Sequence, residues 1–455
     1  MIHAFEYRGT YLVLDVESGA VHEVDKPSYD VISALEQGNA VDALPYSHSL
    51  IEEIMNEIEE LREDGLIDTP APKAPSADAS YSPIKSMCLN VAHDCNLRCA
   101  YCFAETGEFH GGRMLMPFET AKAALDMLIK RSGSRYHLEV DLFGGEPLMN
   151  WEVVKQIVAY GRELEKEHNK HINFTITTNG VALDDEKIDY INREMFNVVI
   201  SIDGRREVHD ALRVTPNKKG SYDLIVPKAQ KLVRERGDGE HYIRGTYTAD
   251  NLDFTEDVKA LHELGFEQIS IEPVVLKPEE PHAINDGNVE RAVDEYDRLA
   301  DYVRECRAEG HPFNFFHFHV DLNDSPCLAK RALGCGAGVE YVAVAPNGDI
   351  YPCHQFVGDS RFLLGNVLDR DEEGNVPLRD DIRQSFASCN IFTKEKCSHC
   401  WAKYYCSGGC AANAYKLNGS ITEPCEVSCR LLKKRTEIAI GMATIDKREQ
   451  EEKED

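Results

Sequence analysis

Three cysteines lie close together near residue 100, Cys95, Cys99 and Cys102, in the spacing C-x3-C-x2-C. A cuboidal iron–sulfur cluster usually takes four protein thiolates, so three would leave one iron open to a ligand that is not protein. A structural zinc site is the alternative, but such sites close with four ligands. No further Cys or His follows within the next few residues, although His93 precedes the loop. The spacing therefore favours an iron–sulfur site with one open position.

A second, denser group of cysteines lies late in the chain, between Cys306 and Cys429. It holds eleven of the fifteen cysteines, and the other four fall between Cys88 and Cys102. We expect a protein of the reducing cytoplasm, because the start of the chain lacks the basic region and apolar run of a signal peptide. Disulfides are rare in that compartment, so metal ligation by thiolates is predicted. For residues 397–410 taken alone, a zinc ribbon is the alternative.

The charge balance is strongly acidic, with 50 Lys and Arg against 79 Asp and Glu and a formal net charge of −29. Such a surface repels polyanions, so we expect no nucleic-acid partner and no anionic membrane partner. No window approaches about 18 uninterrupted apolar residues, so no membrane-spanning helix is predicted. The length of 455 residues leaves room for two or three domains.

Strand-like and helix-like segments alternate six times between residues 84 and 310. The predicted strands are 86–92, 137–143, 172–177, 198–202, 242–247 and 269–275. The predicted helices are 119–130, 151–167, 186–193, 222–236, 255–264 and 289–308. Such alternation predicts a parallel sheet, either doubly wound or a partial barrel.

Four distinctive turns follow the first four predicted strands. They are the cysteine loop at 95–102, Gly-Gly-Glu-Pro at 144–147, Thr-Thr-Asn-Gly at 177–180 and Ser-Ile-Asp-Gly at 201–204. Parallel sheets and barrels bind their ligands at the carboxyl ends of the strands. Any one of these turns would be ordinary by itself, but four in succession predict a site at this edge.

Residues 1–69 are predicted to form a small separate domain. The predicted strands are 3–7, 11–16 and 21–24. Two helices are predicted to follow: Ser28 caps the first, and the second spans 48–64 and ends at Gly65. The pattern is typical of a winged-helix-like module, although its acidity argues against DNA. A linker rich in Pro and Ala over 70–83 separates it from the core.

Beyond residue 310 the strand–helix alternation stops and cysteines dominate. The turn at 346–349 predicts a hairpin between strands at 341–345 and 350–351. Residues 441–455 are expected to be a charged tail that frays at its end.

Together these motifs resemble those of the radical S-adenosylmethionine (SAM) enzymes, which carry C-x3-C-x2-C after the first strand and Gly-Gly-Glu-Pro after the second. The cysteine-rich end resembles their SPASM extension, from Cys335 through the Gly348-x4-Cys353 step to Cys429. The first domain resembles a PqqD-like recognition element for ribosomally made, modified peptides (RiPPs). The resemblance covers nearly the whole chain. It is nearest to the SCIFF-peptide maturases, which form thioether cross-links in the manner of sactisynthases and ranthipeptide synthases.

The resemblance implies a partial (β/α)6 TIM barrel over 84–310, with the recognition element before it and a SPASM iron–sulfur domain over 311–440. It also implies three [4Fe–4S] clusters and SAM, with the SAM-binding cluster on Cys95, Cys99 and Cys102. The residues that would surround SAM are Tyr101, Gly144, Gly145, Glu146, Ser201 and Arg213. The Tyr101 backbone would lie beside the adenine. The two glycines and Glu146 would receive the amino group, Ser201 the ribose, and Arg213 the carboxylate through its planar fork.

The same resemblance assigns the later cysteines to two auxiliary clusters. One set is Cys397, Cys400, Cys406 and Cys429, and the other is Cys335, Cys353 and Cys410. Cys425 competes with Cys429 as last ligand of the first set. Cys327 either completes the second set or leaves an iron open for a substrate thiolate, and the open site is our hypothesis. Cys88, Cys306 and Cys389 are expected to be buried thiols or incidental.

The implied partner is a cysteine-rich precursor peptide whose leader adds to an open strand edge at 20–24. A 5′-deoxyadenosyl radical would abstract a hydrogen from the peptide, and a cysteine sulfur would join that carbon. Flavodoxin or ferredoxin would donate electrons, and no catalytic side chain stands out. One alternative is an anaerobic sulfatase maturase, which forms formylglycine, but that family has an aspartate where this chain has His354. Another is a non-catalytic peptide- or zinc-binding protein.

Overall fold

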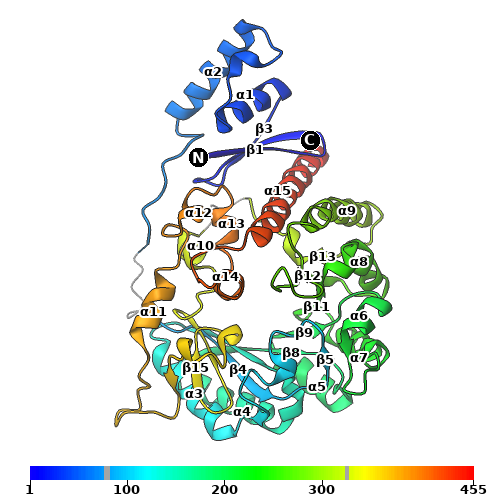
Figure 1. Cartoon of the computed structure of the whole chain (residues 1–455), viewed down its shortest axis with the longest axis vertical. Helices are drawn as coiled ribbons and strands as arrows, with labels where there is room; N and C mark the ends of the chain where they lie inside the picture. Colours follow the sequence, from blue (N-terminus) through cyan, green and yellow to red (C-terminus); the bar gives the residue numbers. More distant parts are fainter. Residues whose placement is uncertain (76–81, 323–326, 455) are drawn as a thin grey trace.

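The computed structural model describes residues 1–75, 82–322 and 327–454. Figure 1 shows a layer of strands wrapped by helices, with a small N-terminal unit above it and helix α15 (Glu426–Glu454) reaching up to that unit. Part of the linker predicted at 70–83 lies outside the described residues. No helix in the described part of the chain combines the length and apolarity needed to cross a membrane.

Six parallel strands form the centre of the main sheet and confirm the predicted partial barrel. They run in the order β12-β11-β9-β8-β7-β4. Their bounds are β4 Ser86–His93, β7 His137–Gly144, β8 His171–Thr178, β9 Asn197–Ser201, β11 His241–Tyr247 and β12 Gln268–Pro273. The intervening helices are α3 Phe118–Arg131, α4 Trp151–His168, α5 Asp185–Glu194, α7 Tyr222–Arg236, α8 Phe254–Glu263 and α9 Val289–Ala308.

Alternation within the strands explains why the barrel interior is polar. In β7, Leu138, Val140 and Leu142 are fully buried, whereas the residues between them are only partly buried. Successive side chains of a strand point to opposite faces. The apolar face therefore packs under the helices, and the other face, which carries Glu139 and Asp141, lines the interior. Such an interior can hold polar ligands.

Strands from beyond residue 310 extend this sheet rather than forming a sheet of their own. β14 (Tyr341–Val344) pairs in parallel with β4 and in antiparallel fashion with β15 (Asp349–Tyr351), which confirms the predicted hairpin. β16 (Gly365–Asn366) continues that edge, and β13 (Asn314–Phe315) lies at the opposite edge. The residues that follow β15 are therefore held against the barrel.

The N-terminal unit contains the predicted three strands and two helices. β1 (Ile2–Tyr7), β2 (Thr10–Asp15) and β3 (Val21–Val24) form an antiparallel sheet in that order. Its separate core joins Val13 of the sheet to helices α1 (Lys26–Glu36) and α2 (His48–Glu63).

The cap predicted for the first helix is wrong. Asp25 is the N-cap of α1, and its carboxylate accepts a hydrogen bond from the backbone of Ser28. Ser28 therefore lies inside the first turn of the helix. Both residue types cap helices well, and Pro27 fixes the choice because proline favours the first positions of a helix.

The charged tail predicted from residue 441 is also wrong, because α15 continues through it. Met442 and Ile445 are buried, and Gly441 lies so close to the Tyr7 ring that an added Cβ would stand 2.4 Å from it. Packing against the N-terminal unit thus stabilises a segment whose last residues are almost all charged.

A buried ion pair connects the N-terminal unit to the cysteine-rich segment. Lys403 donates to Glu17 at 2.6 Å, and their side chains are 5% and 3% exposed. The Tyr404 hydroxyl donates to the other oxygen of Glu17 at 2.6 Å. Beside them, the rings of His3 and Trp401 stack with centroids 3.9 Å apart. The loop after β2 is therefore anchored within the predicted cluster-binding segment.

The change Glu17→Gln should destabilise this junction strongly. It leaves the Lys403 ammonium buried without a counter-charge, which typically costs about 3–5 kcal/mol. We expect a lower unfolding midpoint when thermal unfolding is followed by tryptophan fluorescence. The matched control is Asp381→Asn in the exposed Arg379–Asp381 pair, which should leave the midpoint unchanged. Equal midpoints for both variants would show that the pair does not support the junction.

Candidate functional site

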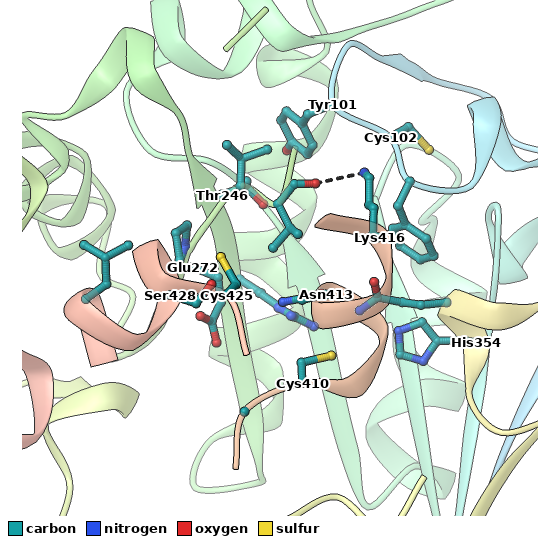
Figure 2. Close-up of a pocket in the computed structure, with 18 of the residues that line it drawn as sticks. Tyr101, Cys102, Thr246, Glu272, His354, Cys410, Asn413, Lys416, Cys425 and Ser428 are labelled. Carbon is teal, nitrogen blue, oxygen red and sulfur yellow. Dashed lines mark hydrogen bonds between the residues drawn. The ribbon is translucent and has the colours of Figure 1, made fainter. Parts of the chain in front are cut away.

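A cavity of about 600 Å³ collects most of the residues predicted to do chemistry, but the predicted ligands Cys335 and Cys353 do not line it. Figure 2 shows Tyr101 and Cys102 at one end and Cys410 and Cys425 at the other. The cysteines that line the cavity are Cys95, Cys99, Cys102, Cys397, Cys400, Cys406, Cys410, Cys425 and Cys429. All six predicted SAM contacts line it as well, namely Tyr101, Gly144, Gly145, Glu146, Ser201 and Arg213.

The first three cysteines project from the loop between β4 and α3. Cys99 lies in the short strand β5 (Arg98–Cys99), whose partner is β10 (Arg213–Val214), so Arg213 is opposite Cys99 in register. Burial raises the pKa of the Cys95 thiol to about 12 and that of Cys99 to about 11. Nearby cysteines add to both shifts, Cys99 and Cys102 to that of Cys95 and Cys102 to that of Cys99. The three side chains are partly buried, and a positively charged iron site would offset the cost of ionising Cys95 and Cys99.

Two glycines allow the end of β7 and the loop after it to approach the end of β4 and the cysteine loop closely. A Cβ on Gly145 would lie 2.4 Å from the Asp94 carbonyl oxygen, and one on Gly144 would lie 2.3 Å from the Ala92 carbonyl oxygen. Gly144 also has a φ of +134°, which residues with side chains rarely adopt. Any other residue would push the two loops apart. These positions therefore fit a cradle for a small ligand beside the cysteines.

Glu146 ties the ends of β7 and β8 together. Its carboxylate is 1% exposed and accepts hydrogen bonds from the Thr178 hydroxyl at 2.8 Å and the Asn179 and Leu148 backbones at 2.8 and 3.0 Å. Burial raises its pKa to about 7, and the three hydrogen bonds oppose that shift. A carboxylate has about four acceptor sites, so one remains for an ammonium group. Its predicted contact with the SAM amino group stays a prediction.

Asp203, which the sequence showed only as part of a turn, organises the adjacent strand ends. Its fully buried carboxylate accepts from the Tyr101 hydroxyl at 2.7 Å, Arg213 Nε at 2.9 Å and the Thr246 backbone at 2.9 Å. The Arg213 guanidinium lies 5.4 Å from the centroid of the Tyr101 ring. Asp203 thus fixes two predicted SAM contacts, and Ser201 lines the cavity at the end of β9.

The pKa shifts of Cys429 and Cys353 each come in part from cysteines of the set predicted for that residue. Burial raises the pKa of Cys429 to about 12, and the neighbouring Cys406, Cys397 and Cys400 add to the shift. In the other set, burial raises the pKa of Cys353, with contributions from Cys410 and Cys335. Each group therefore lies within electrostatic reach of its own members. As ligand sets for clusters, both stay predictions.

Cys425 and Cys327 take different positions. Cys425 directly precedes α15 and lines the cavity, one helical turn before Cys429. Cys327 is exposed at the start of α10 (Leu328–Leu333) and is not among the cavity-lining residues. The open-site hypothesis for Cys327 therefore remains a hypothesis.

A structural zinc site holds its thiolates about 2.3 Å from one ion. Among the described residues, no group of three or more His, Cys, Asp or Glu side chains has the spacing of a metal-ion site. The zinc alternatives and the clusters both stay predictions. Of the remaining cysteines, Cys88 and Cys306 are buried, and the Cys389 thiol donates to the Ile421 carbonyl at 2.9 Å.

Several polar residues on the wall of the cavity escaped the sequence analysis. Glu272 of β12 accepts from Arg435 of α15 at 3.3 Å, and Lys416 of α14 (Ala411–Asn418) donates to the Val275 carbonyl at 2.9 Å, as Figure 2 shows. Arg244 of β11 also lines it. The sequence did hold a signal for Glu272 and Arg244, because both fall inside predicted strands and a charged residue in a buried strand is unusual.

Comparison with known proteins agrees with this geometry. Residues 89–226 match the Radical SAM superfamily. The radical SAM cyclopropyl synthase TigE of Paramaledivibacter caminithermalis is 23% identical over 91% of this chain and 89% of its own length. A cysteine-type anaerobic sulfatase-maturating enzyme of Clostridium novyi is 23% identical over 71% of this chain and 86% of its own.

A solved structure extends the likeness to the whole architecture. The crystal structure of Streptococcus suis SuiB bound to the precursor peptide SuiA superposes with a TM-score of 0.55 at 16% identity. It covers 92% of this chain and 96% of that one. Residues 89–226 therefore resemble a radical SAM domain, and the chain as a whole shares the α/β fold of SuiB.

Proposed function

We propose that this protein is a radical SAM maturase that forms thioether cross-links between cysteine sulfur and a carbon of another residue in a ribosomally made precursor peptide. The observation that carries the proposal is the cavity, which is lined at one end by the three-cysteine loop and at the other by the later cysteines. At about 600 Å³ it has the size of a ligand site. Precursor-peptide binding by SuiB, which has the same fold, supports a peptide substrate.

The chain supplies binding, orientation and shielding. When bound, the clusters and SAM would supply hydrogen-atom abstraction from the peptide and removal of the surplus electron. Gly144 and Gly145 would admit the SAM amino group to the strand ends, and Glu146 would accept its charge. Asp203 would keep Arg213 oriented for the SAM carboxylate. The walls of the cavity would shield the reacting groups from water.

The sulfatase-maturase alternative is supported by the Clostridium novyi relative. His354 argues against it, because this residue stands where that family has an aspartate. Its Nδ1 is 3.2 Å from the Tyr341 hydroxyl. Burial lowers its pKa to about 4, so the ring is neutral at pH 7.

The first residues of the chain would bind the peptide leader. In the three-stranded sheet, β1 and β3 are the edges. The β1 edge is partly covered, because the Ala4 backbone donates to Glu36 at 2.9 Å. For the outer backbone of β3, the described residues provide no hydrogen-bond partner. An extended leader could therefore pair with β3 as a fourth strand.

The activity is tested by incubating the cluster-reconstituted protein anaerobically with SAM, a reductant and a cysteine-rich precursor peptide. We expect loss of two hydrogen atoms per cross-link, with protection of one thiol from alkylation. The Cys95→Ala protein should form neither cross-link nor 5′-deoxyadenosine. Formation of an aldehyde from cysteine would instead support the sulfatase-maturase alternative. An unchanged peptide, with deoxyadenosine still formed, would count against both.

Asp203→Asn should weaken SAM binding by about tenfold, the factor that one lost charge-assisted hydrogen bond gives. An amide has a single acceptor oxygen and cannot accept from all three groups that Asp203 serves. Anaerobic titration calorimetry at equal iron content measures the effect. Glu207→Gln, an exposed change on α6 (Arg206–Leu212), is the control. An unchanged affinity of the Asp203→Asn protein for SAM would show that Asp203 does not position the SAM contacts.

Leader binding should slow hydrogen exchange in β3 of the full-length protein. Backbone amides that gain a strand partner exchange only when that partner opens. We expect protection at residues 21–24 on addition of the leader peptide and little change in β1, the opposite edge. Protection in β1 instead of β3 would place the leader elsewhere.

A further inference from the structure

The cavity contains an arginine whose charge the chain leaves unpaired. Arg244 is the fourth residue of β11 and belongs to the interior-facing series with Tyr242 and Thr246. It is exposed to the cavity, and within the described residues its guanidinium has no hydrogen-bond or ion-pair partner. The two other arginines that line the cavity have partners, Arg213 with Asp203 and Arg435 with Glu272.

Arg244 and Arg213 are held by different elements of the cavity wall. Arg244 is opposite Ser270 of β12 in register, and the Ser270 hydroxyl lies 3.2 Å from Nε2 of His317. Arg213, by contrast, is opposite Cys99 of the cysteine loop.

The residues beside Arg244 leave space for a ligand. Its neighbours in register are Ser201 on β9 and Ser270 on β12, both small. Glu272 of β12 already accepts from Arg435 and lies 3.3 Å from His317. Arg244 and Arg435 therefore both act on one carboxylate, that of Glu272.

A carboxylate can bind the guanidinium of Arg244 through two parallel charge-assisted hydrogen bonds. We propose that Arg244 binds the carboxylate of an aspartate or glutamate side chain of the substrate peptide, at or beside the residue that is cross-linked. This inference rests on the proposed function and adds a substrate class to it. The excess of positive charge here contrasts with the chain as a whole, whose net charge is −29.

The test measures binding of two short synthetic peptides to the full-length, cluster-reconstituted protein with SAM. The probes are Ac-Gly-Cys-Gly-Gly-Asp-Gly-amide and the same peptide with Asn in place of Asp. Their dissociation constants are measured by anaerobic equilibrium dialysis. We expect the Asp peptide to bind about tenfold more tightly, as a charge-assisted bidentate pair requires. Arg244→Gln should abolish the preference, and Arg244→Lys should retain part of it, because lysine keeps the charge without the fork. Arg379→Gln, a surface change, should leave it intact.

Each contrary outcome identifies what failed. Equal binding of the two peptides by the native protein, or a preference that survives Arg244→Gln, overturns this inference alone. If Arg244→Gln instead weakens SAM binding in calorimetry and the native protein shows no Asp preference, the carboxylate is that of SAM and the inference is wrong. Binding of neither peptide, together with no peptide product in the cross-linking reaction, overturns the proposed function as well.

Discussion

The buried carboxylate of Asp203 holds together groups from three separate segments of the chain. It binds the Tyr101 hydroxyl of the cysteine loop, the Arg213 side chain of β10 and the Thr246 backbone of β11. A buried charge persists only when it is paired and hydrogen-bonded. The segments therefore have one low-energy arrangement, in which Tyr101 and Arg213 both line the cavity. Together with Glu146, which ties the ends of β7 and β8, Asp203 gives the rim of the barrel a fixed geometry.

The C-terminal region completes the cavity from the other side. The hairpin of β14 and β15 extends the barrel sheet, and α15 runs from the cavity wall to the N-terminal unit. The Glu17–Lys403 pair then anchors that unit between Cys400 and Cys406. The small unit is therefore attached directly to the segment that carries the later cysteines. A peptide bound at β3 would lie on the N-terminal unit, which the Glu17–Lys403 pair attaches to the cysteine-rich segment.

The sequence predicted the core of the fold well, because the signals were local. All six central strands and their helices follow from alternating periodicity, and four strand-end turns indicated the edge that carries the site. The spacing of Cys95, Cys99 and Cys102 indicated the chemistry, since it is a short-range pattern. The two errors were also local. Ser28 and Asp25 are both good caps, and the final helix has a charge pattern that by itself resembles a frayed tail.

By itself, the sequence determined the order of elements, the polar strand ends and the cysteine groups, because periodicity and spacing are set by neighbouring residues. Tertiary structure alone decided which distant groups meet. The joining of Asp203 to Tyr101, of Glu17 to Lys403 and of Glu272 to Arg435 depends on the sheet order and on the path of α15. Such contacts are governed by packing and by the pairing of buried charge, and no spacing along the chain encodes them. The unpaired charge of Arg244 became visible only once its neighbours in space were known.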